Sequence, residues 1–369
     1  MVTFGTPRNE IGVDIGDVNI GQNYDNFIYL CRCENFTSMR SLSLLTFFLI
    51  LLMGSTSCNK DLNVNADWQD ITVVYGLLDQ TDDTTFIKIT KAFLGPGDAM
   101  QFAKIRDSSY YRDSLETYLA EYTKDTTLVR KIDLSTITIH NKEKGDSIFF
   151  YPDQIMYYTT ARLNQDYIYQ LYIRNKRSGK VVIGWTALVH QFEILRPQTQ
   201  ASFPPGQSFQ VKWTQAKEGK RYQLLIRFFY DEYLIADPKI RETKFADWIV
   251  RSDIKSPDVP TTQPFDLHFA SEGFYSFVGQ KIQKDSTVSR VARYCDFIFS
   301  VAAAEMSTYM DVNEPTLSLV QERPAYTNII NGIGLFSSRY GRKQYDTLFV
   351  SQITKDELKV HPKTKDLGF

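Results

Sequence analysis

Cys58 is the residue of this chain whose surroundings point most clearly to a chemical step. Its thiol follows the small residues Ser55-Thr56-Ser57, and these follow the positive charge of Arg40 and an apolar run from Leu42 to Met53. This order is the three-part layout of a secretory signal, and the apolar region is too short for a permanent transmembrane helix. The sequence therefore predicts a signal peptide over residues 39–57.

The run Ser55-Thr56-Ser57-Cys58 resembles the lipobox of bacterial lipoproteins, a family that more often has Leu at the position of Ser55. The resemblance implies that the Cys58 thiol receives a diacylglycerol, that the signal is cut before Cys58, and that the new amine is acylated. Two or more acyl chains anchor a protein stably in a membrane, whereas one chain binds only marginally. An ordinary secretory signal and an internal apolar segment are the alternative interpretations.

Residues 1–38 precede this signal and are polar, without a hydrophobic period. They contain Cys31 and Cys33, a C-x-C pair that would suit a metal or redox site. Because Met39-Arg40 opens a complete signal by itself, we expect translation to start at Met39 and residues 1–38 to be untranslated or disordered.

The chain has 42 Lys and Arg against 43 Asp and Glu, and the two signs are interspersed. This balance gives no long-range electrostatic field that would attract nucleic acid.

A mature chain of residues 58–369 is long enough for two domains. It keeps one cysteine besides Cys58, which is Cys295 in a strand-like run. We expect Cys295 to be a buried free thiol, with a nucleophile as the alternative.

Alternation of apolar and polar residues along much of the chain indicates β-strands. The clearest runs place on one face Tyr167, Tyr169, Leu171 and Ile173, and in a later strand Tyr222, Leu224, Ile226, Phe228 and Tyr230. An inward Trp213 followed by a hairpin return resembles immunoglobulin-like and fibronectin-like sandwiches. We predict a mainly β protein with two β-sandwich domains and short helical insertions. Its parts are a lipid tether over 58–69, an N-terminal β domain over 70–191, and a C-terminal β-sandwich domain over 192–369 with a helical insertion near 269–283.

Further elements follow from shorter patterns. We expect one strand over Lys131–His140, a short helix over Ala303–Asp311, and a last hairpin of Gly332–Arg339 with Gln344–Ser351. A final helix has Thr354 as its expected N-cap, with an acidic residue three positions later. The polar tail after this helix is expected to be frayed.

The segment from Tyr326 to Arg339 contains Asn331-Gly332, a turn that needs positive φ, and Gly334, which lets another group pack closely. It is similar to the C-terminal run of uncharacterised Bacteroidota-type outer-membrane lipoproteins with domains of unknown function. Lys60-Asp61 resembles the charged sorting signals of surface lipoproteins in such bacteria. These resemblances imply a lipid anchor at the outer membrane, on its periplasmic or cell-surface side. Some of these proteins sit beside outer-membrane transport receptors, so the implied partner is such a receptor or an extracellular ligand.

Other residues with possible chemistry lack the required spacing. The four histidines form no HExxH or HxH motif: His140, His190, His268 and His361. GxSxG and P-loop motifs are absent from the sequence. Asp79, Asp82 and Asp83 could hold calcium but also suit a polar hairpin tip. Asp231 and Glu232 are strand neighbours that point to opposite faces, whereas a glycosidase needs two carboxyls about 5–10 Å apart. The sequence therefore predicts no catalytic residue, cofactor or metal.

The leading hypothesis is a non-catalytic, lipid-anchored envelope protein that acts as a binding or accessory module. Loops on a rigid scaffold commonly carry binding function, so we expect the site at strand edges or at the insertions Gly95–Leu119 and Phe269–Gln283. The alternative is a secreted hydrolase acting on glycans or peptides. It would require two acids, or an acid with His190 or His268, within hydrogen-bond reach.

Overall fold

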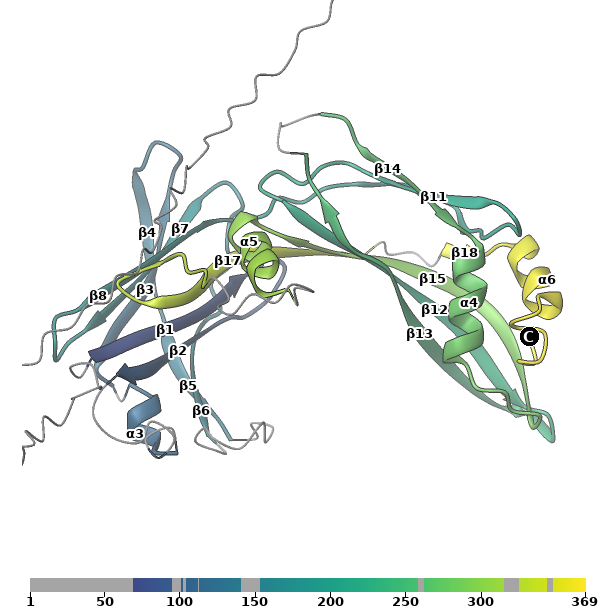
Figure 1. Cartoon of the computed structure of the whole chain (residues 1–369), viewed down its shortest axis with the longest axis horizontal. Coiled ribbons are helices and arrows are strands. Elements are labelled where there is room, and N and C mark those ends of the chain that lie inside the picture. Colours follow the sequence, from purple (N-terminus) through teal and green to yellow (C-terminus); the bar gives the residue numbers. More distant parts are fainter. Residues whose placement is uncertain are drawn as a thin grey trace, which may run out of the picture. The chain divides into compact units, whose positions relative to one another are not determined.

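β-Strands form most of the part of the chain that the structure describes, which confirms the predicted mainly β fold class (Figure 1). The computed structural model describes residues 69–94, 101, 104–111, 113–140, 153–257, 262–314, 325–343 and 348–369. The predicted signal, Cys58, its tether, Cys31 and Cys33 lie outside these described residues. None of the helices in the described ranges is both long and apolar enough to span a membrane.

The first sandwich is built from two sheets that face each other across an apolar core. Along one sheet the neighbours are β17 (Ile333–Lys343), β1 (Gln69–Leu78), β2 (Thr85–Leu94), β6 (Gln154–Thr159) and β5 (Ser135–Ile139). Along the other they are β16 (Ile329–Ile330), β8 (Val181–Ala187), β7 (Ile168–Asn175), β3 (Leu115–Tyr122) and β4 (Leu128–Asp133). The short helix α3 (Arg106–Ser109) precedes β3.

Alternate side chains of these strands fill the space between the two sheets. Ile87 and Ile89 of β2 are buried, whereas Phe86 of the same strand is 44% exposed. Leu171 and Ile173 of β7 enter the same core from the opposite sheet, on the face that their spacing predicts. A fully buried aliphatic side chain contributes about 1.5–3 kcal/mol, so this alternation holds the two sheets together.

The second sandwich has long strands on one side and a smaller sheet on the other. β12 (Arg221–Leu234) lies between β13 (Asp237–Lys255) and β15 (Val288–Ala302), and β15 also pairs with β18 (Leu348–Val350), the neighbour of β10 (Gln200–Ala201). The smaller sheet contains β9 (Ile194–Arg196), β11 (Ser208–Trp213) and β14 (Phe265–Ala270). Two helices contribute to the same core, α4 (Glu272–Lys281) and α6 (Gln352–Val360).

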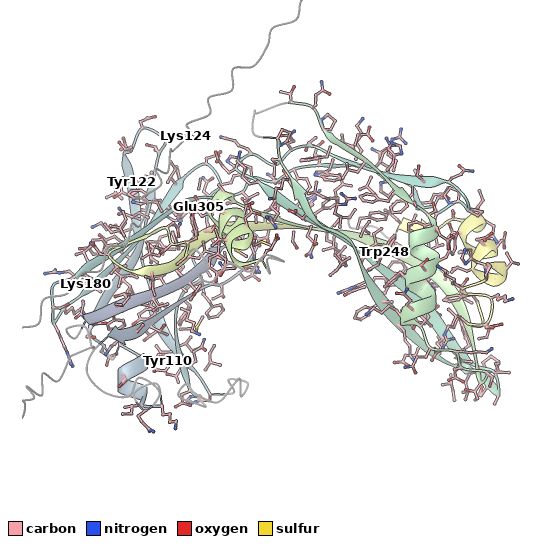
Figure 2. All side chains as sticks on the ribbon, in the orientation of Figure 1. Tyr110, Tyr122, Lys124, Lys180, Trp248 and Glu305 are labelled. Atoms are coloured by element: carbon pink, nitrogen blue, oxygen red, sulfur yellow. The ribbon has the colours of Figure 1, made fainter. Side chains whose placement is uncertain are left out.

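The inward faces predicted for this second sandwich are confirmed. All five alternating residues of β12 are buried, and Trp213 of β11 is fully buried. The predicted helical insertion is α4, and Figure 2 labels Trp248 of β13 beside it. Phe277 of α4 stacks on the ring of Trp248. The short helix predicted after β15 is α5 (Ala304–Asn313). Cys295 is a buried free thiol, as predicted.

The last two strands exist but do not pair with each other. β17 pairs in parallel with β1 up to Ser338, and it pairs antiparallel with β15 from Arg339 onward. β18 pairs with β15 at Tyr294 and Cys295. The predicted last hairpin is therefore wrong, because β15 is the common neighbour of both strands. The domain boundary near Gln191 stays a prediction.

The single strand predicted over Lys131–His140 is also wrong. The chain crosses from one sheet to the other at Leu134, so β4 and β5 belong to opposite sheets. The apolar residues show the physical reason. Ile132 and Leu134 fall on even positions whereas Ile137 and Ile139 fall on odd ones, so one regular strand could not place all four on the same face.

The C-terminal helix and tail differ from their predictions as well. Ser351, not Thr354, is the N-cap of α6, and its hydroxyl accepts the Thr354 N–H at 3.3 Å. The Thr354 hydroxyl instead accepts the Phe203 N–H at 2.8 Å. The tail is docked, since Leu367 is buried in the second core and the Arg290 N–H donates to the Gly368 carbonyl. Burial of an apolar side chain so near the end overrides the tendency of chain termini to fray.

Candidate binding site

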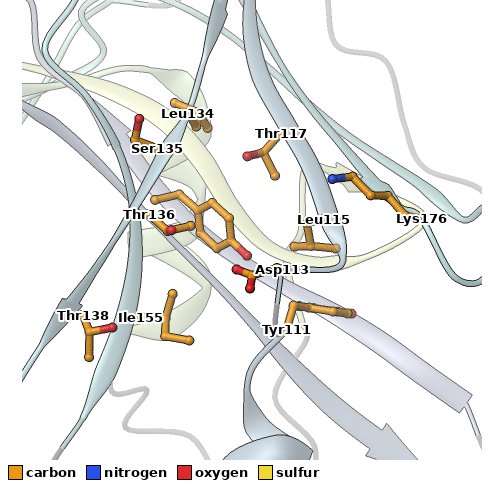
Figure 3. A pocket seen from close by; sticks show the side chains of 11 residues that line it. Tyr111, Asp113, Leu115, Thr117, Leu134, Ser135, Thr136, Thr138, Ile155 and Lys176 are labelled. Atoms are coloured by element: carbon orange, nitrogen blue, oxygen red, sulfur yellow. The ribbon is translucent and has the colours of Figure 1, made fainter.

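A pocket of about 750 Å³ opens between the two sheets of the first sandwich (Figure 3). Strands from both sheets line it, together with the segment before β3 and the residue after β7. The lining residues are Tyr111, Asp113, Leu115, Thr117, Leu134, Ser135, Thr136, Thr138, Ile155, Tyr157 and Lys176.

The crossing at Leu134 places β5 at the wall of this pocket. The Leu134 N–H donates to the Thr117 carbonyl at 3.1 Å, which ties the crossing to β3. β5 then pairs with β6, with Thr136 opposite Tyr157. Because directly opposite residues of paired strands share a face, Thr136 points to the same side as the buried Tyr157. The same register brings Thr138 to this face.

Tyr111 forms a fixed polar corner of the pocket. Its hydroxyl donates to Asp70 Oδ1 at 2.7 Å and lies 2.9 Å from the hydroxyl of Thr72. The ammonium of Lys91 lies 5.0 Å from the centre of its ring. Burial raises the pKa of Tyr111 well above its ordinary value, and the Asp70 carboxylate acts in the same direction. Tyr111 is therefore a neutral, oriented phenol at physiological pH.

Tyr157 is the second neutral phenol of the lining. Burial raises the pKa of Tyr157 to about 12, and the nearby Asp113 carboxylate disfavours the phenolate further. Asp113 itself is exposed at the pocket rim. A phenol that stays protonated can donate a hydrogen bond to a ligand but cannot serve as a base near neutral pH.

The charge of the lining is balanced. Among the described lining residues, Asp113 carries the one carboxylate and Lys176 the one ammonium. Hydroxyl groups from four strand residues and two tyrosines supply the other polar atoms, and three aliphatic side chains supply apolar surface. Such a lining suits an uncharged polar group with some apolar surface.

None of the four histidines is among the described residues that line this pocket. His140 and His361 pair with Asp153 and Glu272, each at 3.0 Å. His268 lies 3.6 Å from its strand neighbour Asp266 on an exposed surface. Burial lowers the pKa of His190, the fourth histidine. No group of three or more His, Cys, Asp or Glu in the described ranges has a geometry that could hold a metal.

The acidic pairs singled out in the sequence are engaged in ion pairs. Asp231 is fully buried beneath Arg241 and Arg293, at 3.2 Å and 3.3 Å. Its neighbour Glu232 pairs with Lys244 at 2.6 Å and Arg290 at 2.9 Å. Both carboxylates are therefore paired with cations, and neither is among the described residues that line the pocket.

The acidic turn after β1 has a structural role. Asp79 Oδ1 accepts the Thr81 N–H at 2.9 Å and the Thr81 hydroxyl at 2.6 Å. Arg339 pairs with Asp79 at 3.5 Å and with Asp82 at 3.3 Å. This is the polar hairpin tip that the sequence suggested beside the calcium interpretation.

The two predicted insertions have different places in the fold. The described part of Gly95–Leu119 supplies four pocket residues, from Tyr111 to Thr117. The segment Phe269–Gln283 instead buries the aromatic face of α4, including Phe274 and Tyr275, in the second core. The sequence analysis did not predict that β5 lines a pocket. The apolar residues change from even to odd positions around Leu134, and this change indicates a break between two strands.

No protein-family model matches this chain, and no curated protein is similar to it.

Proposed function

We propose that this chain is a non-catalytic, lipid-anchored protein of the cell envelope that acts as a binding or accessory module. The observation that carries the proposal is the position of Cys58 directly after small residues and the apolar run Leu42–Met53. Its acylated amino end would hold the protein at the outer membrane. The partner would be an outer-membrane receptor protein, such as a transport receptor, or an extracellular ligand.

The length of the connecting segment is compatible with this role. Residues 59–68 separate Cys58 from β1. Ten residues can span at most about 35 Å, so a β-rich body on this tether would stay close to the lipid surface. A ligand pocket between two rigid sheets is a suitable feature for a protein that binds rather than converts its ligand.

Recovery of the native complex from membranes tests this function. The full chain would be expressed in its authentic host, and membranes would be solubilised with several mild detergents. We expect wild-type protein in the membrane fraction together with a partner in fixed ratio, and we expect Cys58→Ala to release the protein from the membrane. Cys295→Ala is the matched control, because it removes the other mature cysteine and should leave membrane retention unchanged. Wild-type protein that is recovered alone in every detergent would contradict the binding role.

A further inference from the structure

We propose that β5 is an acceptor edge for β-strand addition, and that its partner is an extended, uncharged segment of another protein. The backbone of this segment would pair with β5, and every second side chain would enter the pocket between the sheets. The inference rests on the proposed function as a binding module and names the kind of partner that this pocket takes.

The first observation is the open backbone of β5. Within the described chain, β5 pairs with β6 on one side and with no strand on its other side (Figure 1). A strand at a sheet edge presents a row of unpaired N–H and C=O groups, which matches the repeat of a second polypeptide backbone. A glycan has no such regular alternation of donors and acceptors.

The second observation is that β5 lacks the usual protection of an edge. Natural edge strands are commonly guarded by charged residues or proline, which prevent unwanted pairing. The other described edge strands of comparable or greater length, β4, β13 and β14, all contain charged residues. β5 has the sequence Ser-Thr-Ile-Thr-Ile and contains none. Its isoleucines are also solvent-accessible, with Ile137 44% exposed and Ile139 39% exposed.

The third observation is the position of the pocket beside this edge. Thr136 and Thr138 line the pocket together with Asp113 (Figure 3), whereas Ile137 alternates with them and points to the other face. A strand added to β5 would have the same alternation. One set of its side chains would lie beside Thr136 and Thr138 at the pocket, and the other set would extend the apolar surface of the isoleucines.

The volume of the pocket favours a foreign strand over a second copy of this chain. In a dimer joined edge to edge through β5, the second copy would bring its own Thr136 and Thr138 to this face. These short side chains could not fill a pocket of about 750 Å³. A partner segment with larger uncharged side chains, such as Tyr, Gln or Leu at alternate positions, fits both the volume and the balanced charge of the lining.

Photo-crosslinking in the authentic host tests the pairing directly. A photoreactive residue is placed singly at positions 136, 137, 138 and 139 of the full chain, and at Leu128 as control. Leu128 is also 44% exposed but lies on the charged edge strand β4. We expect crosslinks to one partner segment with a period of two: positions 137 and 139 label residues of one parity, and positions 136 and 138 label residues of the other. Crosslinks that scatter over the partner, that form equally well from Leu128, or that join β5 to β5 of a second copy would overturn the inference.

A charged side chain on the edge provides the second test. Ile137→Lys should reduce the partner recovered with the membrane-bound protein at least tenfold, and Leu128→Lys, at equal exposure, should change it less than twofold. Ile139→Lys repeats the test at a second exposed position, and unfolding midpoints equal to wild type verify that the variants are folded. A complex that survives both isoleucine variants contradicts the acceptor edge but leaves the proposed function intact. Membrane-bound wild type without any partner contradicts the proposed function itself.

Discussion

Gly334 lies directly against Val74, and only glycine can occupy its position. The two residues are opposite each other where β17 pairs in parallel with β1, and Gly334 has φ of +119°. A Cβ atom on Gly334 would overlap the carbonyl oxygen of Val74. This close approach is what allows a strand from the C-terminal part of the chain to complete the first sheet.

We therefore expect Gly334→Ala to destabilise the protein by about 3 kcal/mol or more, since it combines backbone strain with a steric clash. Gly341→Ala is the matched control on the same strand, because nothing lies within 4 Å of its added Cβ. It should change the free energy of unfolding by no more than about 0.5 kcal/mol. Urea denaturation of both variants checks this, and equal effects would show that the close approach does not matter.

Glu121 should contribute far more to stability than its strand neighbour Glu116. Glu121 is buried and accepts hydrogen bonds from Arg130 at 2.8 Å and from the Tyr169 hydroxyl at 2.9 Å. Glu121→Ala removes both hydrogen bonds, one of them from a charged guanidinium, whereas the Tyr169 hydroxyl keeps the Asn164 carbonyl at 3.2 Å as an acceptor. We therefore expect a loss of about 2 kcal/mol, which is typical of a hydrogen bond to a charged group. Glu116 pairs with Arg174 at the surface, and Glu116→Ala should cost less than about 1 kcal/mol. Chemical denaturation measures both, and similar losses would contradict the assignment.

Glu232 should make stability depend on acid pH. Burial alone would raise its pKa, but hydrogen bonds from Lys244 and Arg290 outweigh burial and hold the pKa below its ordinary value of 4.5. Because the folded pKa is the lower one, this stabilisation is present above pH 4.5 and is lost as the pH falls through the folded pKa.

The stability difference between wild type and Glu232→Gln should therefore be largest near neutral pH and shrink in acid. Unfolding free energies measured along a pH series decide the point. A difference that stays constant in acid would mean that Glu232 does not titrate as described.

Cys295 should resist alkylation in the folded protein. Burial raises the pKa of its thiol far above the ordinary range, and the Asp296 carboxylate acts in the same direction. Iodoacetamide should label Cys295 only after denaturation, as read by mass spectrometry of the peptide that contains it. The control is S289C, an exposed position on the same strand β15, which should react in the folded state. Equal labelling rates for the two thiols would contradict the burial of Cys295.

The sequence predicted the features that depend on local alternation. The buried face of β12 from Tyr222 to Tyr230 and the inward Trp213 follow from residue spacing, and the structure confirms them. Pairing of β17 with β1 and β15 joins residues far apart in the chain, and no local pattern specifies it. The pocket was not predicted, because its lining residues come from several separate segments that meet only in the folded chain.

Mass spectrometry of the amino end of the processed protein, isolated from its authentic host, tests the central claim most directly. We expect a mature chain that starts at Cys58, with a diacylglycerol on the thiol and an acyl group on the amine. A chain that keeps its leader, or that carries an unmodified thiol at Cys58, would contradict the claim that this β-rich protein is held at a membrane by lipid.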